Sequence, residues 1–378
     1  MLSLATIWIS QALLSDKCKY IYGSRGRQAD IASSFGALEL TIPLDTLDTS
    51  NPYVFLKEIS SDGNVNTIDV IYPMFPIMNV LDPTWIKMLL APIAAYLDTG
   101  KWSHPYAVHD IGASYPNATG HNEGNAESIL LEANAGFLIL FYDYQKLTGD
   151  KTFAQTHAKI LRQYASYLVN NGLYPISQLD TVDSIPASAN QTNLALVSAI
   201  GLNAYAAMTG DQSYSTTAKS FVNKLVTDGL GLDKERTHFT YNYGNDSTWG
   251  TIFNLFSDQL LDLYTFSSDI RQMQCAWYEK HATATGYPYA GSWPQSNGLW
   301  AMWFAPTCGA KIQEEIIADE YRFLTNGKNN LPFPDRFVVS GDKAGDWYGP
   351  VGYARPTLGG VFSVLASNGV KINIGSNA

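Results

Sequence analysis

The most constraining feature of this sequence is a helix pair that repeats along its middle. Apolar residues recur at positions i, i+3, i+4 and i+7, which is the spacing of one face of an α-helix. A Thr-Gly-Asp triplet closes such a stretch at residues 148–150 and again at residues 209–211. In each triplet the Gly can end one helix and the Asp can begin the next. The pattern therefore predicts antiparallel helical hairpins joined in series.

The number of predicted helices defines the expected architecture. Twelve helices in antiparallel pairs fit a closed double ring of six hairpins, so we expect an all-α fold, an (α/α)6 toroid, with few short strands. We expect residues 1–378 to form one domain. Residues 1–27 are expected to be an N-terminal helix and connecting segment, whose role stays open. The predicted helices span 3–14, 28–40, 83–97, 127–147, 151–169, 190–208, 212–226, 249–264, 269–281, 295–304, 311–324 and 356–366, and the predicted strands span 67–72 and 336–340.

Long connections separate many of these helices and are rich in Gly, Pro, Asn and Asp. In a helical toroid they gather at the ends of the ring, and long loops in a compact protein more often carry function than not. We therefore expect the functional residues on these loops. They span 43–66, 100–126, 174–189, 231–248 and 327–355.

Composition excludes several classes of protein. With 46% hydrophobic and 15% charged residues, the chain is not intrinsically disordered. Its 24 basic and 34 acidic residues give a net charge of −10, which excludes the basic surface that nucleic acids require. No apolar run reaches the roughly 20 residues that span a bilayer. We therefore expect a small-molecule substrate, with neither nucleic acid nor membrane as a partner.

Low charge, many aromatic residues and three glycosylation sequons favour an extracellular hydrolase. The sequons begin at Asn117, Asn190 and Asn245. The apolar stretch 2–14 lacks a basic start, so we interpret it as a helix of the fold rather than a signal peptide. We nevertheless expect secretion and glycosylation.

Cysteine and motif patterns indicate neither a metal nor a cofactor. Cys18, Cys275 and Cys308 form no CxxC pair, and an odd count leaves at least one thiol unpaired. A disulfide between Cys275 and Cys308 is possible, but the sequence does not decide whether it forms. The loop 121–127 faintly resembles a calcium loop but lacks its spaced acidic ligands. No GxSxG, P-loop or GxGxxG pattern is present.

Ionisable side chains are densest between residues 109 and 132. Two carboxyl groups with separated pKa values can perform general acid/base hydrolysis. The alternative is a solvated loop in which an Asp caps a turn. The group comprises His109, Asp110, His121, Glu123, Glu127 and Glu132, of which Asp110, Glu123 and Glu132 are the predicted catalytic residues.

Glu132 is the sharpest of these candidates because its neighbours are apolar. It follows Ile129, Leu130 and Leu131 in a predicted helix. A carboxylate in such surroundings needs a partner or a raised pKa. A purely structural ion pair with Arg or Lys is the alternative.

Aromatic residues in polar loops are candidates for a binding pocket. Trp293 and Trp347 lie in such loops and can stack on a substrate. Trp300 and Trp303 are spaced as one face of a helix, so we expect them in the core.

Several segments, in order along the chain, resemble the fungal secreted glutaminase A family. The match runs over about residues 28–365, and no single short motif carries it. At one family motif with an acidic pair, this chain has Leu131-Glu132-Ala133 instead. The matching segments span 57–64, 67–73, 109–112, 115–125, 190–195, 247–250, 332–335 and 355–360.

This resemblance implies an (α/α)6 toroid of the six-hairpin glycosidase type and hydrolysis of L-glutamine to L-glutamate and ammonia. Family members usually carry an N-terminal β-rich region, which we do not find in these 378 residues. The predicted substrate-binding residues are Asp69, Tyr72, His109, His121, Asn190, Trp249 and Arg355, which fall on family motifs, together with Trp293 from the aromatic loop.

Three functions remain open at this point. In the first, Glu132 or Asp110 activates water against the side-chain amide, while Arg355 binds the substrate carboxylate. The second is glycoside hydrolysis by two carboxyl groups on the same toroid. The third is a non-catalytic, secreted binding or immunomodulatory protein derived from the family. Absence of a β-rich partner domain exposes apolar surface, so we also expect self-association into a homo-oligomer.

Overall fold

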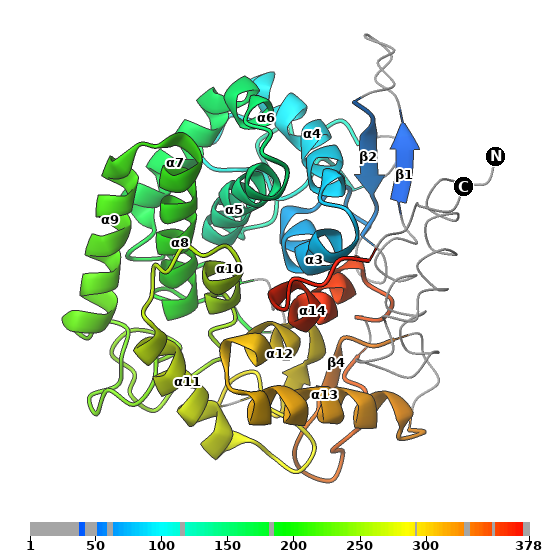
Figure 1. Ribbon diagram of the computed structural model, residues 1–378, viewed down its shortest axis with the longest axis vertical. Helices are drawn as coiled ribbons and strands as arrows, with labels where there is room; N and C mark the ends of the chain where they lie inside the picture. The colour runs from blue at the N-terminus through cyan, green and yellow to red at the C-terminus, as the bar shows by residue number, and fades with distance from the viewer. Residues whose placement is uncertain are drawn as a thin grey trace.

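Six inner helical elements form a closed ring (Figure 1). The computed structural model describes residues 38–41, 51–58, 63–113, 118–180, 185–291, 293–328, 333–349 and 352–372. Within them α3 packs on α5, α5 on α8, α8 on α10, α10 on α12, α12 on η4, and η4 back on α3. The inner elements are α3 (Ile68–Leu81), α5 (Leu130–Thr148), α8 (Thr192–Thr209), α10 (Leu255–Leu260), α12 (Gly298–Phe304) and η4 with α14 (Pro356–Phe362, Ser363–Ser367).

An outer layer of helices surrounds this ring. Each outer helix follows its inner partner after a short connection, so the two run antiparallel as a hairpin, and the predicted (α/α)6 toroid is confirmed. The outer helices are α4 (Thr84–Asp98), α6 with α7 (Thr152–Thr156, Ala158–Asn171), α9 with the π turn η2 (Gln212–Val222, Asn223–Thr227), α11 (Ser268–His281) and, after the turn η3 (Ala305–Thr307), α13 (Ala310–Thr325).

The hairpin topology places the long loops together. Every short connection leaves the carboxyl end of an inner helix, so the amino ends of all inner helices lie at the opposite face of the ring. The loops at 99–129, 172–191, 228–254, 282–297 and 326–355 lead into those amino ends. Because helix amino ends carry partial positive charge, this loop face suits acidic side chains and polar ligands.

Burial on all sides explains why the inner helices lack a polar face. All but one residue of α3 and nearly all of α8 are buried in one continuous apolar core. Two antiparallel strand pairs flank the ring. β1 (Leu38–Thr41) pairs with β2 (Tyr53–Leu56), and β3 (Gln295–Asn297) pairs with β4 (Arg336–Val338).

Four of the predicted element boundaries are wrong. Residues 67–72 begin helix α3 instead of forming a strand, because a fully buried helix shows no 3.6-residue period. The predicted helix 28–40 ends in strand β1, 249–264 contains only the short α10, and 295–304 opens with β3. Tertiary pairing overrides local pattern in these places. The predicted helix 3–14 lies outside the described residues.

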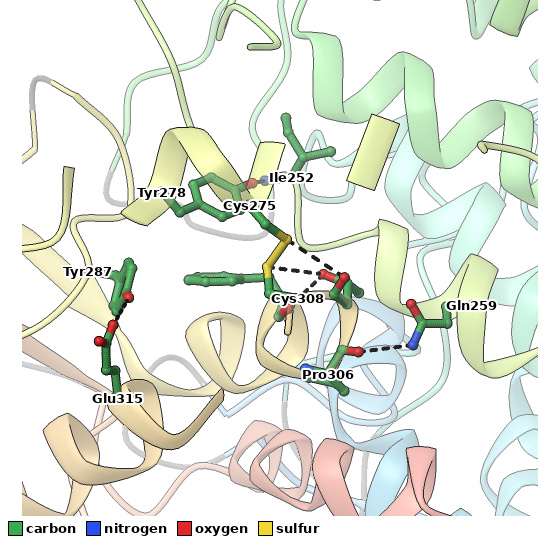
Figure 2. The surroundings of a disulfide bond; sticks show 10 residues. Ile252, Gln259, Cys275, Tyr278, Tyr287, Pro306, Cys308 and Glu315 are labelled. Carbon is green, nitrogen blue, oxygen red and sulfur yellow. Dashed lines mark hydrogen bonds between the residues drawn. A yellow bond between two sulfur atoms is a disulfide. The ribbon is translucent and has the colours of Figure 1, made fainter. Parts of the chain in front are cut away.

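A disulfide joins Cys275 of α11 to Cys308, which follows η3, with Cα atoms 5.6 Å apart (Figure 2). Nearby, the Gln259 side-chain amide donates to the Pro306 carbonyl oxygen at 3.0 Å. Both links stabilise the part of the ring around α10, which has only six residues. The third cysteine, Cys18, lies outside the described residues.

Replacing both Cys275 and Cys308 by Ala is expected to lower the free energy of unfolding by about 3 to 4 kcal/mol, because the bond closes a long loop. Its sequence separation is 33 residues. Urea unfolding followed by tryptophan fluorescence measures the loss. Wild-type protein unfolded with a reductant is the matched control and should show the same loss. Equal stability of the oxidised protein and the double variant contradicts a stabilising role.

Candidate active site

Family-motif residues that are far apart in sequence meet at the loop face. Asp69 lies in the first turn of α3 and Glu132 in the first turn of α5. Asn190 precedes α8, Trp249 precedes α10, and Arg355 directly precedes η4. Each stands at or before the amino end of an inner helix, so the parallel inner ring brings them to one end of the molecule.

Two buried carboxyl groups and two tyrosines form the centre of this face. Glu132 is 1% exposed and Asp180 is 2% exposed. The Tyr241 and Tyr289 hydroxyls both donate to Asp180 Oδ2, at 3.1 and 3.2 Å. Burial, followed by the charge of Asp180 and a contribution from Glu132, raises the pKa of both phenols above its ordinary value. Both tyrosines are therefore protonated donors at neutral pH.

Gln178 fixes Asp180 beside the start of α5. The Leu131 backbone N–H donates to Gln178 Oε1 at 2.9 Å. One residue on, the Leu179 N–H donates to the Ser128 carbonyl oxygen at 3.1 Å. Because these bonds hold the 172–191 loop to the first turn of α5, Asp180 and Glu132 are brought to the same place.

A pocket of about 260 Å³ lies at this face. Tyr241 lines the pocket and also contacts Asp180, so one side chain links the pocket wall to the buried carboxyl groups. The Trp293 side chain lines the pocket, and its buried indole N–H has no hydrogen-bond partner among the described residues. The wall includes Ile185, Pro186, Ser188, Tyr241, Asn242, Ser247, Thr248, Trp249, Ala290 and Trp293.

The close approach of the Gly291 backbone holds the Trp249 ring in the pocket wall. A Cβ atom on Gly291 would lie 2.4 Å from Trp249 Nε1, so only glycine fits beside the indole. On its other side the ring approaches His281, with ring centres 5.1 Å apart. The indole is therefore held rigidly, as a wall that positions a ligand needs to be.

A second cluster of ionisable groups joins α3 to the 99–129 loop. His109 contacts Asp69 through Nε2 at 3.0 Å and Asp110 through Nδ1 at 2.8 Å. Asp110 Oδ1 also lies 2.7 Å from His121 Nε2 and accepts the Gly112 N–H at 2.7 Å. Both ring nitrogens of His109 face carboxylates, so both carry protons and the ring is a cation.

Ionisation within this cluster follows from its contacts. Burial alone would lower the pKa of His109, but the charge of Asp69 and the hydrogen bonds to Asp110 and Asp69 hold it well above its ordinary value. Burial raises the pKa of Asp110, yet its bonds and charge interaction with His109, and its bonds to His121 and Gly112, hold it below the ordinary value. The cluster is thus a charge-paired link between α3 and the loop.

Three further residues of interest, Glu123, Glu127 and Tyr72, do not line the pocket. Glu123 is 58% exposed and lies 3.4 Å from His121 Nδ1, at the outer end of the cluster. Glu127 Oε2 is 3.7 Å from His109 Nε2. Tyr72 is buried in the core, where its hydroxyl donates to Asn254 Oδ1 at 2.9 Å. The structure therefore separates Glu123 from Glu132 and brings Glu132 together with Asp180.

Arg355 is paired with carboxylates of the protein itself. Its guanidinium contacts Glu58 at 2.6 Å and Asp335 at 3.6 Å. A substrate carboxylate would have to compete with both. This arrangement links η4 to the segment before α3 and helps close the ring.

The sequons differ in what the structure shows. Asn190 and Asn245 are exposed, and Asn117 lies outside the described residues.

Among the helices described, none combines the length and the apolar character needed to cross a membrane.

Sequence reasoning missed Asp180, Tyr241 and Tyr289. Asp180 stands in a predicted loop directly after Leu179, and an acidic residue within a partly aliphatic loop is the signal that marks it. Tyr241 and Tyr289 have no such local signal among 23 tyrosines. Only the packing of three loops brings them to one carboxylate.

The closed double ring and its loop-face pocket define an (α/α)6 toroid of the six-hairpin glycosidase type. A wild-type glycosidase of known structure superposes with a TM-score of 0.52 at 9% identity, over 97% of each chain. A glycosidase in complex with glucose gives 0.55 at 9% identity, over 97% of this chain and 98% of that one. These likenesses show the fold.

The chain belongs to the glutaminase A six helical-hairpin domain family, whose pattern matches residues 28–365. It is 32% identical over 340 residues to glutaminase A of Aspergillus oryzae, covering 88% of this chain and 48% of that protein. It is 26% identical over 406 residues to a probable glutaminase of Arthroderma benhamiae, covering 84% and 47%. The chain thus spans about half the length of these curated relatives, whose names support a hydrolase-like function.

Proposed function

We propose that this protein is a secreted hydrolase that converts L-glutamine to L-glutamate and ammonia at the loop-face pocket. Relatives named glutaminase support the choice of substrate. The exposed Asn190 and Asn245 sequons support secretion and glycosylation. The observation that carries the proposal is the pair of buried carboxyl groups, Glu132 and Asp180, next to Tyr241, which lines the pocket.

Two carboxyl groups provide the chemistry that amide hydrolysis needs. One removes a proton from water as it attacks the side-chain carbonyl carbon, and the other protonates the departing nitrogen. The Trp293 indole N–H, which has no hydrogen-bond partner in the described part of the chain, can donate to the substrate carbonyl oxygen as negative charge develops there. The pocket volume of about 260 Å³ accommodates a glutamine side chain.

Ammonia release from L-glutamine by the purified chain tests this function. Asp180→Asn is expected to lower kcat by about a hundred-fold or more, because an amide cannot accept the proton. Glu314→Gln, an exposed change on α13, is the matched control and should retain wild-type activity. A folded wild-type chain that releases no ammonia contradicts the proposal, and so does an Asp180→Asn variant of undiminished activity.

The second candidate function is glycoside hydrolysis, which the indole rings of Trp249 and Trp293 favour. Both border the pocket, and such rings can stack on a sugar face. Assays for reducing sugar with simple glycosides, run beside the ammonia assay, distinguish the two functions. Sugar release without ammonia supports the glycosidase, and binding without turnover supports a non-catalytic protein.

A further inference from the structure

We propose that Asn193 is a specificity-determining residue that binds the carboxamide of the substrate and selects an amide over a carboxylate. The identity of the ligand rests on the proposed function, whereas the assignment of Asn193 to ligand binding rests on its own surroundings. Asn193 lies in the first turn of α8, at the loop face of the ring.

The side-chain amide of Asn193 is buried without a hydrogen-bond partner. Neither Nδ2 nor Oδ1 bonds to any of the residues that the structure describes, and the residue is 8% exposed. A buried amide without partners lowers stability, because it has lost its bonds to water and gained none. A ligand that offers both an acceptor and a donor would satisfy this amide, which itself has two donor hydrogens and an acceptor oxygen.

Neighbouring positions on α8 show where the Asn193 side chain points. Gly201 packs against Ala135 of α5, and the Asn203 amide donates to the Leu263 carbonyl oxygen, just after α10, at 3.2 Å. Helices α5 and α10 are the two inner neighbours of α8. At about 100° per residue, Asn193 lies about 80° from Gly201 and about 80° from Asn203, between the two. It therefore faces the axis of the ring.

The far side of α8 faces the outer layer, as this orientation requires. Tyr205 lies about 120° around the helix from Asn193. Its ring contacts the ring of Tyr214 on the outer helix α9, with centres 4.7 Å apart. Asn193 therefore points away from the outer helices.

Glu132 of α5 also points toward the axis. Ala135 packs on α8, and a Cβ atom on Gly136 would lie 3.0 Å from the ring of Tyr72 on α3. On the helix, Ala135 and Gly136 lie about 60° and about 40° to either side of Glu132. Asn193 and Glu132 thus converge from adjacent inner helices on the loop-face end of the axis.

A second amide beside the axis also has an unpartnered group. Tyr72 reaches from α3 across the ring to α10, where its hydroxyl donates to Asn254 Oδ1 at 2.9 Å and lies 3.0 Å from Ser257 Oγ. The Asn254 Nδ2 group is buried and has no hydrogen-bond partner in the described part of the chain. Asn193 and Asn254 together therefore leave donors and an acceptor for a polar ligand at this end of the ring.

A carboxamide matches Asn193 better than a carboxylate does. Asn193 Oδ1 needs a donor, which the N–H of a carboxamide supplies and an ionised carboxylate does not. Asn193 Nδ2 needs an acceptor, which either group supplies. A site that hydrogen-bonds a substrate N–H discriminates strongly against an analogue that lacks it. Asn193 should therefore favour the amide substrate over the carboxylate product of its hydrolysis.

Urea unfolding of Asn193→Leu tests the ligand role without any enzyme activity. Leu keeps the branching of Asn at Cγ but has no polar atoms, so the unliganded variant should be at least as stable as wild type. Asn193→Ala, which cannot overfill the site, should behave in the same way. Asn134→Leu is the matched control and should lose stability, because Asn134 is buried, donates to the Leu130 carbonyl oxygen at 2.6 Å and accepts from the Ala107 N–H at 3.2 Å.

Steady-state kinetics provide the second measurement. Asn193→Leu and Asn193→Ala are expected to raise KM for L-glutamine by about ten- to a hundred-fold, with a smaller change in kcat. The inhibition constant of L-glutamate should change by less than about three-fold, because the carboxylate has no N–H to lose as a partner.

The outcomes separate this inference from the proposed function. An unchanged preference for L-glutamine over L-glutamate in both Asn193 variants overturns the inference, and so does a loss of stability in both that equals the loss in Asn134→Leu. A wild-type chain that releases no ammonia contradicts the proposed function. L-Glutamine is then not consumed, so calorimetric titration with L-glutamine and L-glutamate measures the same preference and decides the role of Asn193.

Discussion

Glu132→Gln is expected to lower kcat for ammonia release by about a thousand-fold while the protein stays folded. Gln keeps the shape of Glu but cannot give a proton to the departing nitrogen. The side chain is buried in the first turn of α5, so water cannot readily replace it as the acid. Steady-state ammonia assays, with circular dichroism to check folding, measure the effect.

A substrate with a better leaving group separates the two carboxyl roles. A γ-glutamyl p-nitroanilide depends less on protonation of its leaving group, so Glu132→Gln should recover much of its lost activity on this substrate. Asp180→Asn should not recover, because attack by water still needs a base. Glu314→Gln again serves as the control. Equal losses of Glu132→Gln on both substrates would remove Glu132 from the acid role.

His109→Gln is expected to lower the free energy of unfolding by about 3 to 5 kcal/mol near neutral pH. The substitution removes a buried cation and leaves the carboxylates of Asp69 and Asp110 without it, which is costlier than replacing a whole ion pair. Urea unfolding measures the loss. His157→Gln is the matched control, since His157 contacts the more exposed Asp98 at 2.6 Å, and we expect about 1 kcal/mol or less there.

The difference between wild type and His109→Gln should depend on pH in a defined direction. The raised pKa of His109 contributes stability that is complete below its ordinary value of 6.5 and is lost as pH rises through its folded-state value. The lowered pKa of Asp110 contributes stability above its ordinary value of 3.8, lost as pH falls through its folded-state value. The wild-type advantage should therefore be largest between about pH 4 and 6.5. A pH-independent difference would contradict this charge pairing.

The outer layer of the toroid was largely predictable from the sequence. Helices α4, α9, α11 and α13 lie close to the predicted ranges because one side of each faces solvent and leaves a periodic pattern. Helix α3 was mistaken for a strand because burial on all sides removes that pattern. Its two internal prolines, Pro73 and Pro76, weaken the local evidence for a helix further.

The site was predictable only in part. Glu132 stood out because a carboxylate among aliphatic residues is costly without a purpose, and its burial agrees with that pattern. Asp180 carries only a weak signal, an acidic residue after Leu179 in a loop, and such a residue is ordinary until its burial is known. Arg355 was predicted to bind the substrate carboxylate, but in the structure it pairs with Glu58 and Asp335. The sequence did not reveal these pairs because the partners are distant along the chain.

The sequence by itself determined the helical hairpins, the long loops and the apolar surroundings of Glu132, since all three depend on neighbours along the chain. Only the tertiary structure decided which loop residues meet. The parallel amino ends of the inner helices converge on one face, and there Tyr241 and Tyr289 reach Asp180 from separate loops. Such contacts join residues that are many positions apart in the sequence. These residues meet because the ring closes, and no local sequence pattern encodes that closure.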